Sequence, residues 1–125
     1  MPTTTRALAE RHEIVWLELT ALHKQAATLA ARRPLEAVGG SVREEARAAL
    51  HRSAPFWRRK RDPLPPPAVD WAGLDLQLGR IVGQLDAWEA LHTAWDRKLG
   101  CQCWRVEGEP MPVRRLRPPV PPPPP

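Results

Sequence analysis

This chain contains only two cysteines and no run of about 18 apolar residues. The scarcity of cysteine excludes a small fold held together by several disulfides, and the lack of a long apolar run excludes a membrane-spanning helix, so we expect no membrane partner. The N-terminal segment lacks the basic, apolar and small-residue layout of a signal peptide. We therefore expect a cytoplasmic protein.

Motifs that support enzyme chemistry are absent as well. The sequence has no phosphate-binding glycine loop, no His-Glu-x-x-His and no nucleophile elbow. We expect a protein that is not an enzyme and carries no cofactor.

The composition is short of several residue types. There is no asparagine, no tyrosine and one phenylalanine, whereas arginine is abundant, at 16 residues against 3 lysines. The formal net charge of +5 has two interpretations that the sequence leaves open: a compositional drift toward arginine, or a basic surface that binds phosphate groups. With 125 residues, the chain has room for one domain with a modest core.

Apolar residues in the first part of the chain recur with the spacing of one helical face. They are Leu8, Val15, Leu19, Leu22, Ala26 and Leu29. Thr4 or Thr5 can cap the start of this helix, and Pro34 ends it by disfavouring helical geometry at the preceding residue. The pattern predicts a helix over about residues 5–33.

A shorter helix is predicted over about residues 41–53. Two glycines break the chain before it, and Ser41 with Glu44 has the spacing of a capping box. Residues 54–69 then contain five prolines and a run of four cations. Because proline cannot continue a helix, this segment is predicted to be an extended basic linker.

The strongest helical pattern begins at Asp70, a favourable N-cap residue. Apolar and aromatic residues follow at alternating steps of four and three, as in a coiled-coil seam. They are Leu74, Leu78, Ile81, Leu85, Trp88, His92, Trp95 and Leu99. Gly100 marks the end, so the pattern predicts a helix over about residues 70–99 in which Trp88 and Trp95 are buried.

Two long helices joined through a short helix and a linker pack most simply side by side. The fold class expected is all-α: an antiparallel helical hairpin of two long helices with a short third helix, within a domain of residues 1–109. Residues 110–125 are rich in proline and are expected to form a disordered tail. The apolar faces are wider than one hairpin covers, which favours a homo-oligomer or a protein partner along the helical seams. The function expected is a non-catalytic helical interaction module, such as an accessory or adaptor subunit of a larger assembly.

An alternative function lies in the basic segment of the linker. Aromatic rings there can stack on bases while cations neutralise phosphates, the chemistry of proteins that bind single-stranded nucleic acid. The candidate residues are Phe56, Trp57, Arg58, Arg59, Lys60 and Arg61. Because four cations are a small footprint, we expect at most weak nucleic-acid binding that falls with salt. The opposing interpretation is a solvated linker whose two aromatic residues pack onto the helices.

The tail offers a candidate site for a protein partner. Arg115, Pro118 and Pro121 have the spacing of a basic residue followed by a PxxP core. In polyproline II geometry this pattern suits an aromatic-lined groove on another protein. The alternative is a proline-rich tail without a partner.

Histidines and cysteines supply the last candidate, a small zinc-binding site. In an antiparallel hairpin His12 and His92 lie at a similar level, close to the segment that holds Cys101 and Cys103. Two thiolates and two imidazoles form a tetrahedral zinc set, but structural sites usually have wider cysteine spacing. We therefore favour cysteines that pack as small apolar side chains at the open end of the bundle. Glu89 and His92 also form half of a di-iron carboxylate motif, of which the chain has no second copy.

Overall fold

The structure is a computed structural model that describes residues 2–59 and 62–113. Its elements, in chain order, are α1 (Arg6–Arg32), α2 (Gly40–Ser53), a short 3-10 helix η1 (Ala54–Phe56), α3 (Trp71–His92) and the strands β1 (Thr93–Asp96), β2 (Cys101–Trp104) and β3 (Met111–Pro112). The fold is therefore mostly helical, as expected, with a small sheet that the all-α prediction does not include.

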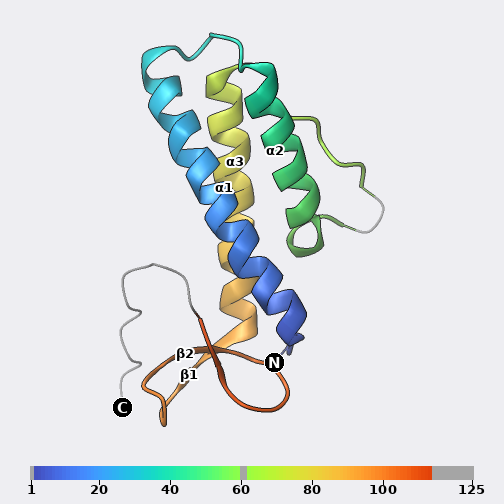
Figure 1. The fold of residues 1–125 in the computed structure, drawn as a ribbon, viewed down its shortest axis with the longest axis vertical. Coiled ribbons are helices and arrows are strands. Elements are labelled where there is room, and N and C mark those ends of the chain that lie inside the picture. The colour runs from blue at the N-terminus through green and yellow to red at the C-terminus, as the bar shows by residue number, and fades with distance from the viewer. Residues whose placement is uncertain (1, 60–61, 114–125) are drawn as a thin grey trace.

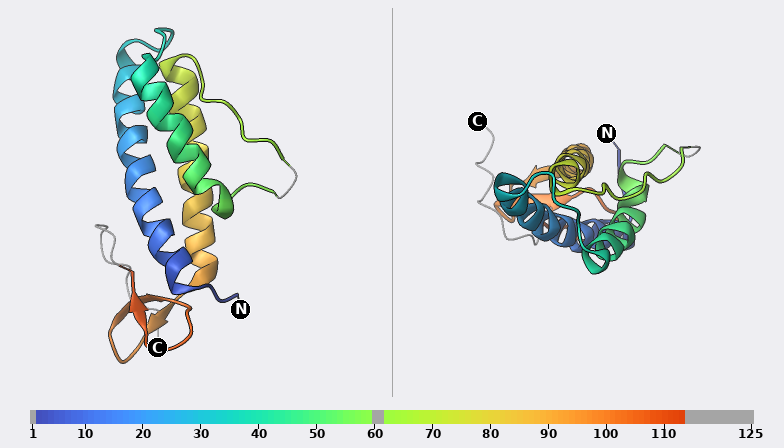
Figure 2. Two further views of the ribbon diagram at one scale, coloured as in Figure 1. Left: turned by 45° about the vertical axis from the view of Figure 1, so that its right-hand side comes forward. Right: turned by 90° about the horizontal axis from the view of Figure 1, so that it is seen from above.

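The two long helices run antiparallel and side by side, as the hairpin prediction requires. α1 and α3 extend along the long axis of the molecule, and α2 packs beside them (Figure 1). Seen from above, the three helices are grouped around a shared core, and the chain between α2 and α3 loops outward before it returns (Figure 2). The sheet lies at the end of the bundle where α1 begins and α3 ends (Figure 1). None of the described helices has the length and apolar character that crossing a bilayer requires.

The core of the bundle is built from the apolar faces of all three helices. Its most deeply buried side chains include Val15 and Leu19 of α1, Ala46, Ala49 and Leu50 of α2, and Leu74, Leu78 and Leu85 of α3. Burial of apolar surface contributes roughly 25 cal/mol per Å², so these interlocked faces are the main source of stability. The short helix thus completes the core that two helices alone would leave open.

Two predicted helix caps are confirmed. The Thr5 hydroxyl accepts a hydrogen bond from the backbone N–H of Leu8 (3.1 Å), and the Asp70 carboxylate accepts one from Gly73 (2.8 Å). Glycine permits the second approach, because a Cβ at residue 73 would lie 2.8 Å from the carboxylate oxygen. The sequence therefore predicts the starts of both long helices to within a residue.

The capping box predicted for α2 is wrong. Gly39 is the N-cap and provides no side-chain cap, so the helix begins at Gly40 and Ser41 lies inside it. Glu44, the expected partner of Ser41, instead forms an ion pair with Arg47 at 3.4 Å. Two consecutive glycines place the start of the helix earlier than the side-chain pattern does.

The prediction that the third helix continues to residue 99 is also wrong, because α3 ends at His92. Side chains beyond that point compete with helical hydrogen bonds: the Asp96 carboxylate accepts the backbone N–H groups of Lys98 and Leu99, both at 2.9 Å. Gly100, with a φ of +66°, then completes a tight turn into β2. The alternating steps of four and three therefore continue through a segment that is not helical.

The small sheet has the strand order β1-β2-β3, and both strand pairs are antiparallel. Trp104 on β2 lies opposite Thr93 on one side and Met111 on the other. Met111 and Pro112 belong to the segment expected to be a disordered tail, so ordered structure continues past residue 109. The expected tail from residue 114 onward lies outside the described residues.

The two tryptophans expected in one helical seam occupy different elements. Trp88, on α3, is half-buried and packs against the rings of Phe56 and His92, with centroid distances of 4.8 and 3.9 Å. Trp95 is also half-buried, but it lies on β1 and not on a helix. The seam prediction is therefore wrong for Trp95, because the helix ends before it.

A buried polar contact fixes the sheet to the bundle. The indole N–H of Trp104 donates to the carboxylate of Glu13 on α1 at 2.8 Å, and both side chains are buried. Trp104 also packs with Ala9 and Met111 in a small apolar cluster separate from the main core. Each polar group satisfies the other away from water, so the contact positions β2 without leaving the indole N–H unpaired.

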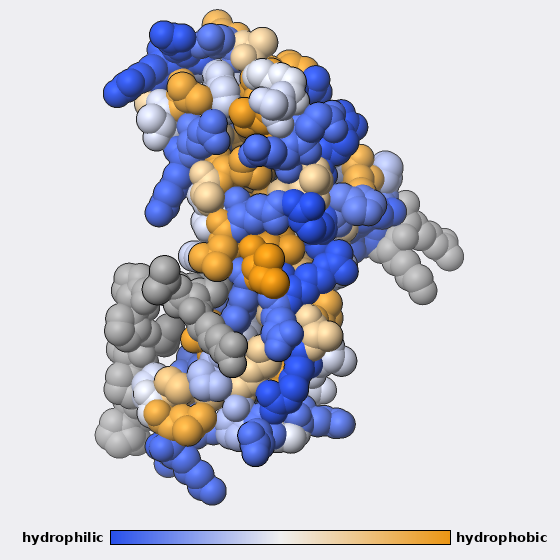
Figure 3. Space-filling model, viewed as in Figure 1, coloured by the Kyte–Doolittle hydropathy of each residue, from blue (hydrophilic) through white to orange (hydrophobic). Residues whose placement is uncertain are grey.

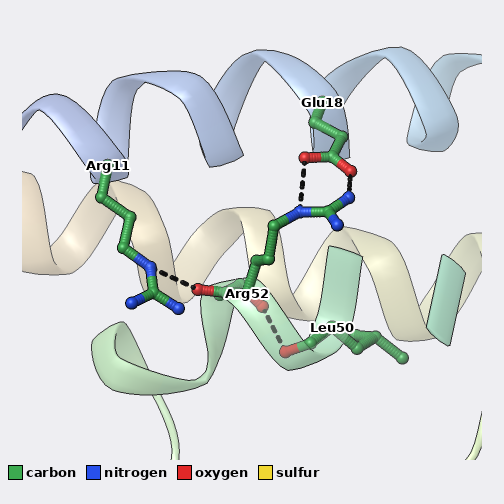
Figure 4. A network of polar contacts seen from close by, with 5 residues as sticks. Arg11, Glu18, Leu50 and Arg52 are labelled. Atoms are coloured by element: carbon green, nitrogen blue, oxygen red, sulfur yellow. Dashed lines mark hydrogen bonds and ion pairs between the residues drawn. The ribbon is translucent and has the colours of Figure 1, made fainter. Parts of the chain in front are cut away.

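A polar network ties the C-terminal end of α2 to α1 (Figure 4). The Arg52 guanidinium makes two bonds to the Glu18 carboxylate, and Arg11 donates to the backbone carbonyl of Arg52 at 3.2 Å. The Ser53 hydroxyl donates to the carbonyl of Leu50 at 2.9 Å, which satisfies one of the free carbonyls at the helix end. This network sets the position at which the chain leaves α2 and the linker begins.

We predict that Leu78→Ala lowers the free energy of unfolding by about 2–5 kcal/mol, because Leu78 is fully buried and its truncation leaves a cavity. The matched control is Leu76→Ala on the same helix, where the side chain is 65% exposed and the expected change is within about 0.5 kcal/mol. Urea denaturation followed by circular dichroism measures both. Equal effects of the two substitutions would contradict the orientation of α3.

Candidate functional site

The basic linker begins with one buried and one half-buried aromatic residue. Phe56 is 5% exposed and packs edge-on against His12 (5.0 Å between centroids) and against Trp88. The neighbouring Trp57 is half-buried, and its indole N–H donates to the Ser53 hydroxyl at 2.7 Å. Burial removes Phe56 from the candidate surface and leaves Trp57 as the aromatic residue at its edge.

The cations that follow are exposed where the structure describes them. Arg58 and Arg59 lie at the surface, and Arg58 Nε donates to the backbone carbonyl of Asp62 at 2.5 Å. Lys60 and Arg61, the other two predicted cations, lie outside the described residues. Arg58 and Arg59 are therefore the part of the basic run that the structure describes.

The linker and α3 form the two sides of a groove of about 670 Å³. It is lined by Trp57, Arg58, Arg59, Asp62, Pro65, Pro66, Ala68, Gly73, Leu76, Gln77, Arg80, Ile81 and Gln84. Its walls combine cationic, amide, aromatic and apolar side chains. The volume lies within the range of roughly 300–1,000 Å³ that is typical of ligand-binding pockets.

The Gln77 side chain holds the linker against α3. Its Oε1 accepts the backbone N–H of Ala68, and its Nε2 donates to the carbonyl of Pro66, both at 2.9 Å. From the other side, Arg43 of α2 donates to the carbonyl of Pro67 at 3.2 Å. These bonds hold an extended, proline-rich segment in one position, and so define the shape of the groove.

The groove has an excess of positive charge. Arg58 and Arg59 of the linker and Arg80 of α3 line it, and Asp62 is the acidic residue among its lining. Among the residues that the structure describes, none of these three guanidinium groups forms an ion pair, whereas three other arginines each pair with a glutamate. The groove therefore favours an anionic ligand.

Three of the lining residues, Trp57, Arg58 and Arg59, are candidates from the sequence, and the side of the groove that α3 provides is not among those candidates. Leu76, Gln77 and Arg80 come from α3, whose opposite face supplies the core. Helical spacing places these three residues on one outward side, and that signal is readable from the sequence. It does not say that residues 57–69 return to cover this side, which is information about tertiary structure.

The four residues considered for a zinc site are not brought together. His12 is fully buried, and its Nε2 donates to the backbone carbonyl of Leu85 at 2.8 Å. The Trp88 ring is stacked on His12 at 5.2 Å and on His92 at 3.9 Å. The two histidines thus lie near the same level, as expected, but each is packed against an indole. No group of three or more His, Cys, Asp or Glu side chains in the described part of the chain is placed to hold a metal ion.

The two cysteines share one face of β2. Cys101 is half-buried, Cys103 is 6% exposed, and their sulfur atoms are 3.9 Å apart. Strand alternation places Trp104 on the face that packs against α1, so the two cysteines lie on the opposite, outer face of β2. Burial is the main cause that raises the pKa of Cys103 to about 11, with contributions from the hydrogen bond and charge of Cys101 and from the charge of Asp96.

The candidate residues in the tail, Arg115, Pro118 and Pro121, lie outside the described residues, so the polyproline partner stays a prediction. Comparison of the chain with known protein families, with curated proteins and with solved structures finds no match. The function is therefore inferred from this chain's own residues.

We predict that Gln77→Ala frees the linker from α3 without unfolding the bundle. The backbone N–H of Ala68 loses its acceptor, so its hydrogen exchange accelerates, while exchange in α1 is unchanged. Gln84→Ala is the control, because Gln84 lines the same groove and is exposed. Exchange measured by NMR distinguishes the two variants. Unchanged protection of Ala68 in Gln77→Ala would show that this side chain does not hold the linker.

We also predict that Cys103 is alkylated slowly at neutral pH. Iodoacetamide reacts with the thiolate, and a pKa of about 11 leaves about 0.1% of this thiol ionised at pH 8. The rate should therefore keep rising with pH above 9 until it levels near 11, provided that the fold persists. Mass spectrometry of the labelled peptide measures the rate, with urea-unfolded protein as the control. A plateau near pH 9 in the folded protein would contradict the raised pKa.

Proposed function

We propose that this protein is a non-catalytic interaction module that binds an acidic, partly apolar segment of a partner protein in the groove between the linker and α3. The observation that carries the proposal is the placement of Arg58, Arg59 and Arg80 around one concave surface with apolar walls. An accessory or adaptor role in a larger assembly follows from such binding.

The charge of the groove selects the sign of the ligand. Guanidinium groups bind carboxylates through paired hydrogen bonds, which give directional as well as electrostatic selectivity. Three such groups come from two separate chain segments, so an extended acidic ligand can bridge the linker and α3. The formal net charge of +5 adds long-range attraction for an acidic partner.

The apolar residues in the walls of the groove select for a second property of the ligand besides its charge. Leu76 is 65% exposed, and Ile81, Pro65 and Pro66 also line the groove. On the face that Figure 3 shows, hydrophobic residues form separate areas between hydrophilic ones. A ligand that carries apolar side chains between its carboxylates uses both properties of the groove, and a purely anionic ligand uses one.

The lining favours binding over catalysis. It contains no Ser, Cys or His among its described residues, and Asp62 is the one carboxylate. Covalent catalysis needs a nucleophile within reach of a base, and this set provides no such pair. The bonds from Gln77 and Arg43 hold the linker in advance of binding, which lowers the entropy lost when a ligand is captured.

Single-stranded nucleic acid is the second candidate ligand. Trp57 lies beside Arg58 and Arg59 on the groove, and an aromatic ring next to cations is the arrangement on which bases stack. We place it second because Phe56 is buried and because the apolar side of α3 has no role in neutralising phosphates.

Fluorescence anisotropy with two labelled probes tests the proposal: a peptide in which glutamates alternate with leucines, and an oligothymidylate of similar charge. We expect the peptide to bind more tightly at physiological salt. Arg59→Ala and Arg80→Ala should each weaken peptide binding about two- to fivefold, the range for solvent-exposed ion pairs, and the double variant about four- to 25-fold.

Arg97→Ala is the matched control, because Arg97 is an exposed arginine in the turn between β1 and β2, away from the groove. It makes the same change in net charge and should leave peptide affinity within about twofold of the parent protein. Equal weakening by Arg97→Ala and Arg80→Ala would mean that general charge attraction, and not the groove, accounts for peptide binding. Preferential binding of the oligothymidylate would establish the second candidate in its place.

A further inference from the structure

The paired cysteines on the outer face of β2 are a second feature that the proposed function does not use. Their sulfur atoms are 3.9 Å apart, and the Cys103 sulfur lies 3.8 Å from the backbone carbonyl of Cys101. Residues two apart on a strand project from the same side, so the strand geometry itself holds both thiols together. Cys101 is half-buried and Cys103 is 6% exposed, so an ion reaches the pair from the Cys101 side.

This separation matches a pair of sulfur atoms that share one metal ion. Two metal–thiolate bonds of about 2.3 Å that end on sulfurs 3.9 Å apart enclose an angle of about 115° at the metal. That angle lies between the tetrahedral and trigonal values. The side chains therefore need little movement to chelate an ion.

A disulfide fits the same strand less well. With a rise of roughly 3.3 Å per residue, the Cα atoms of residues 101 and 103 are about 6.6 Å apart, near the upper end of the range of about 4.4–6.8 Å found in disulfides. Two bonds to a metal span a wider sulfur separation than one sulfur–sulfur bond does. Chelation is therefore the better use of this pair.

The surroundings decide which ions the pair can hold. Zinc in structural sites takes four protein ligands, and no third His, Cys, Asp or Glu joins the cysteines to form a metal-binding group among residues 2–59 and 62–113. Soft ions that bind thiolates strongly, above all Cu(I), are the ones selected by a site made of sulfur alone. Asp96 lies opposite Cys101 in the strand register, and its negative charge favours a bound cation.

We propose that Cys101 and Cys103 form a two-thiolate chelate for a soft, thiophilic metal ion, with Cu(I) as its natural member. The two S–H protons leave to solvent as two sulfur–copper bonds form, and no electron is transferred. Because Cys103 is protonated at neutral pH, uptake of the ion competes with its proton. The described residues supply two of the three positions of a trigonal ion, so a ligand from solution takes the third.

The test is a competition titration of the reduced full-length chain, without oxygen, against the purple complex of Cu(I) with bicinchoninate. Ascorbate in excess keeps copper reduced. We expect the parent protein to withdraw one Cu(I) per chain. Cys101→Ser should lower the affinity by more than the roughly 10–100-fold that contacts outside the ligand shell contribute. Thermal unfolding by circular dichroism checks that this variant, altered at a half-buried position, keeps its fold.

Met111→Leu is the matched control. It removes a soft sulfur atom at similar volume from β3, where Met111 lies opposite Trp104 on the inner face, and should leave copper affinity unchanged. Three results would overturn the proposal: no copper withdrawn by the parent protein, full retention in Cys101→Ser, or one copper per two chains, which would mean that the ion bridges molecules.

Discussion

The imidazole of His12 is the point at which the four parts of this structure meet. It is fully buried in α1, donates to the carbonyl of Leu85 on α3, and lies against the rings of Phe56 from η1, Trp88 from α3 and Trp104 from β2. Burying a polar ring costs stability unless it is hydrogen-bonded, so this bond sets the height of α1 relative to α3. The same contacts fix where the linker leaves the bundle and where the sheet docks.

The parts of the fold that follow from local chemistry could be predicted from the sequence. The apolar face of α1, its Thr5 cap and the Asp70 cap of α3 each depend on residues within one or two helical turns. Periodicity fails at the end of α3, where Trp95 and Leu99 keep the helical spacing. There the Asp96 side chain accepts backbone N–H groups in the turn after β1, a contact that hydrophobic patterning does not register.

The groove and the cysteine pair differ in how far their geometry can be predicted from the sequence. Strand alternation is local, so Cys101 and Cys103 could be placed side by side once the segment was recognised as extended. The groove needs α3 and the linker together, and the contact that joins them, Gln77 to Ala68 and Pro66, involves a glutamine with no motif around it. Tertiary packing determines such a site, and a single sequence does not reveal it.

The contact between Glu13 and Trp104 has a consequence for the order in which the chain acquires its structure. It joins residues 91 positions apart, and the backbone bond from Thr4 to Arg105 closes a loop of similar length. Closing long loops costs entropy before any contact repays it, so these links form late relative to the helices. While the chain is being synthesised, the start of α1 is made first and receives its covering strand last. We expect the Glu13 carboxylate and the His12 imidazole of α1 to face solvent for most of that interval. The end of the bundle that carries the sheet is then the last part to close.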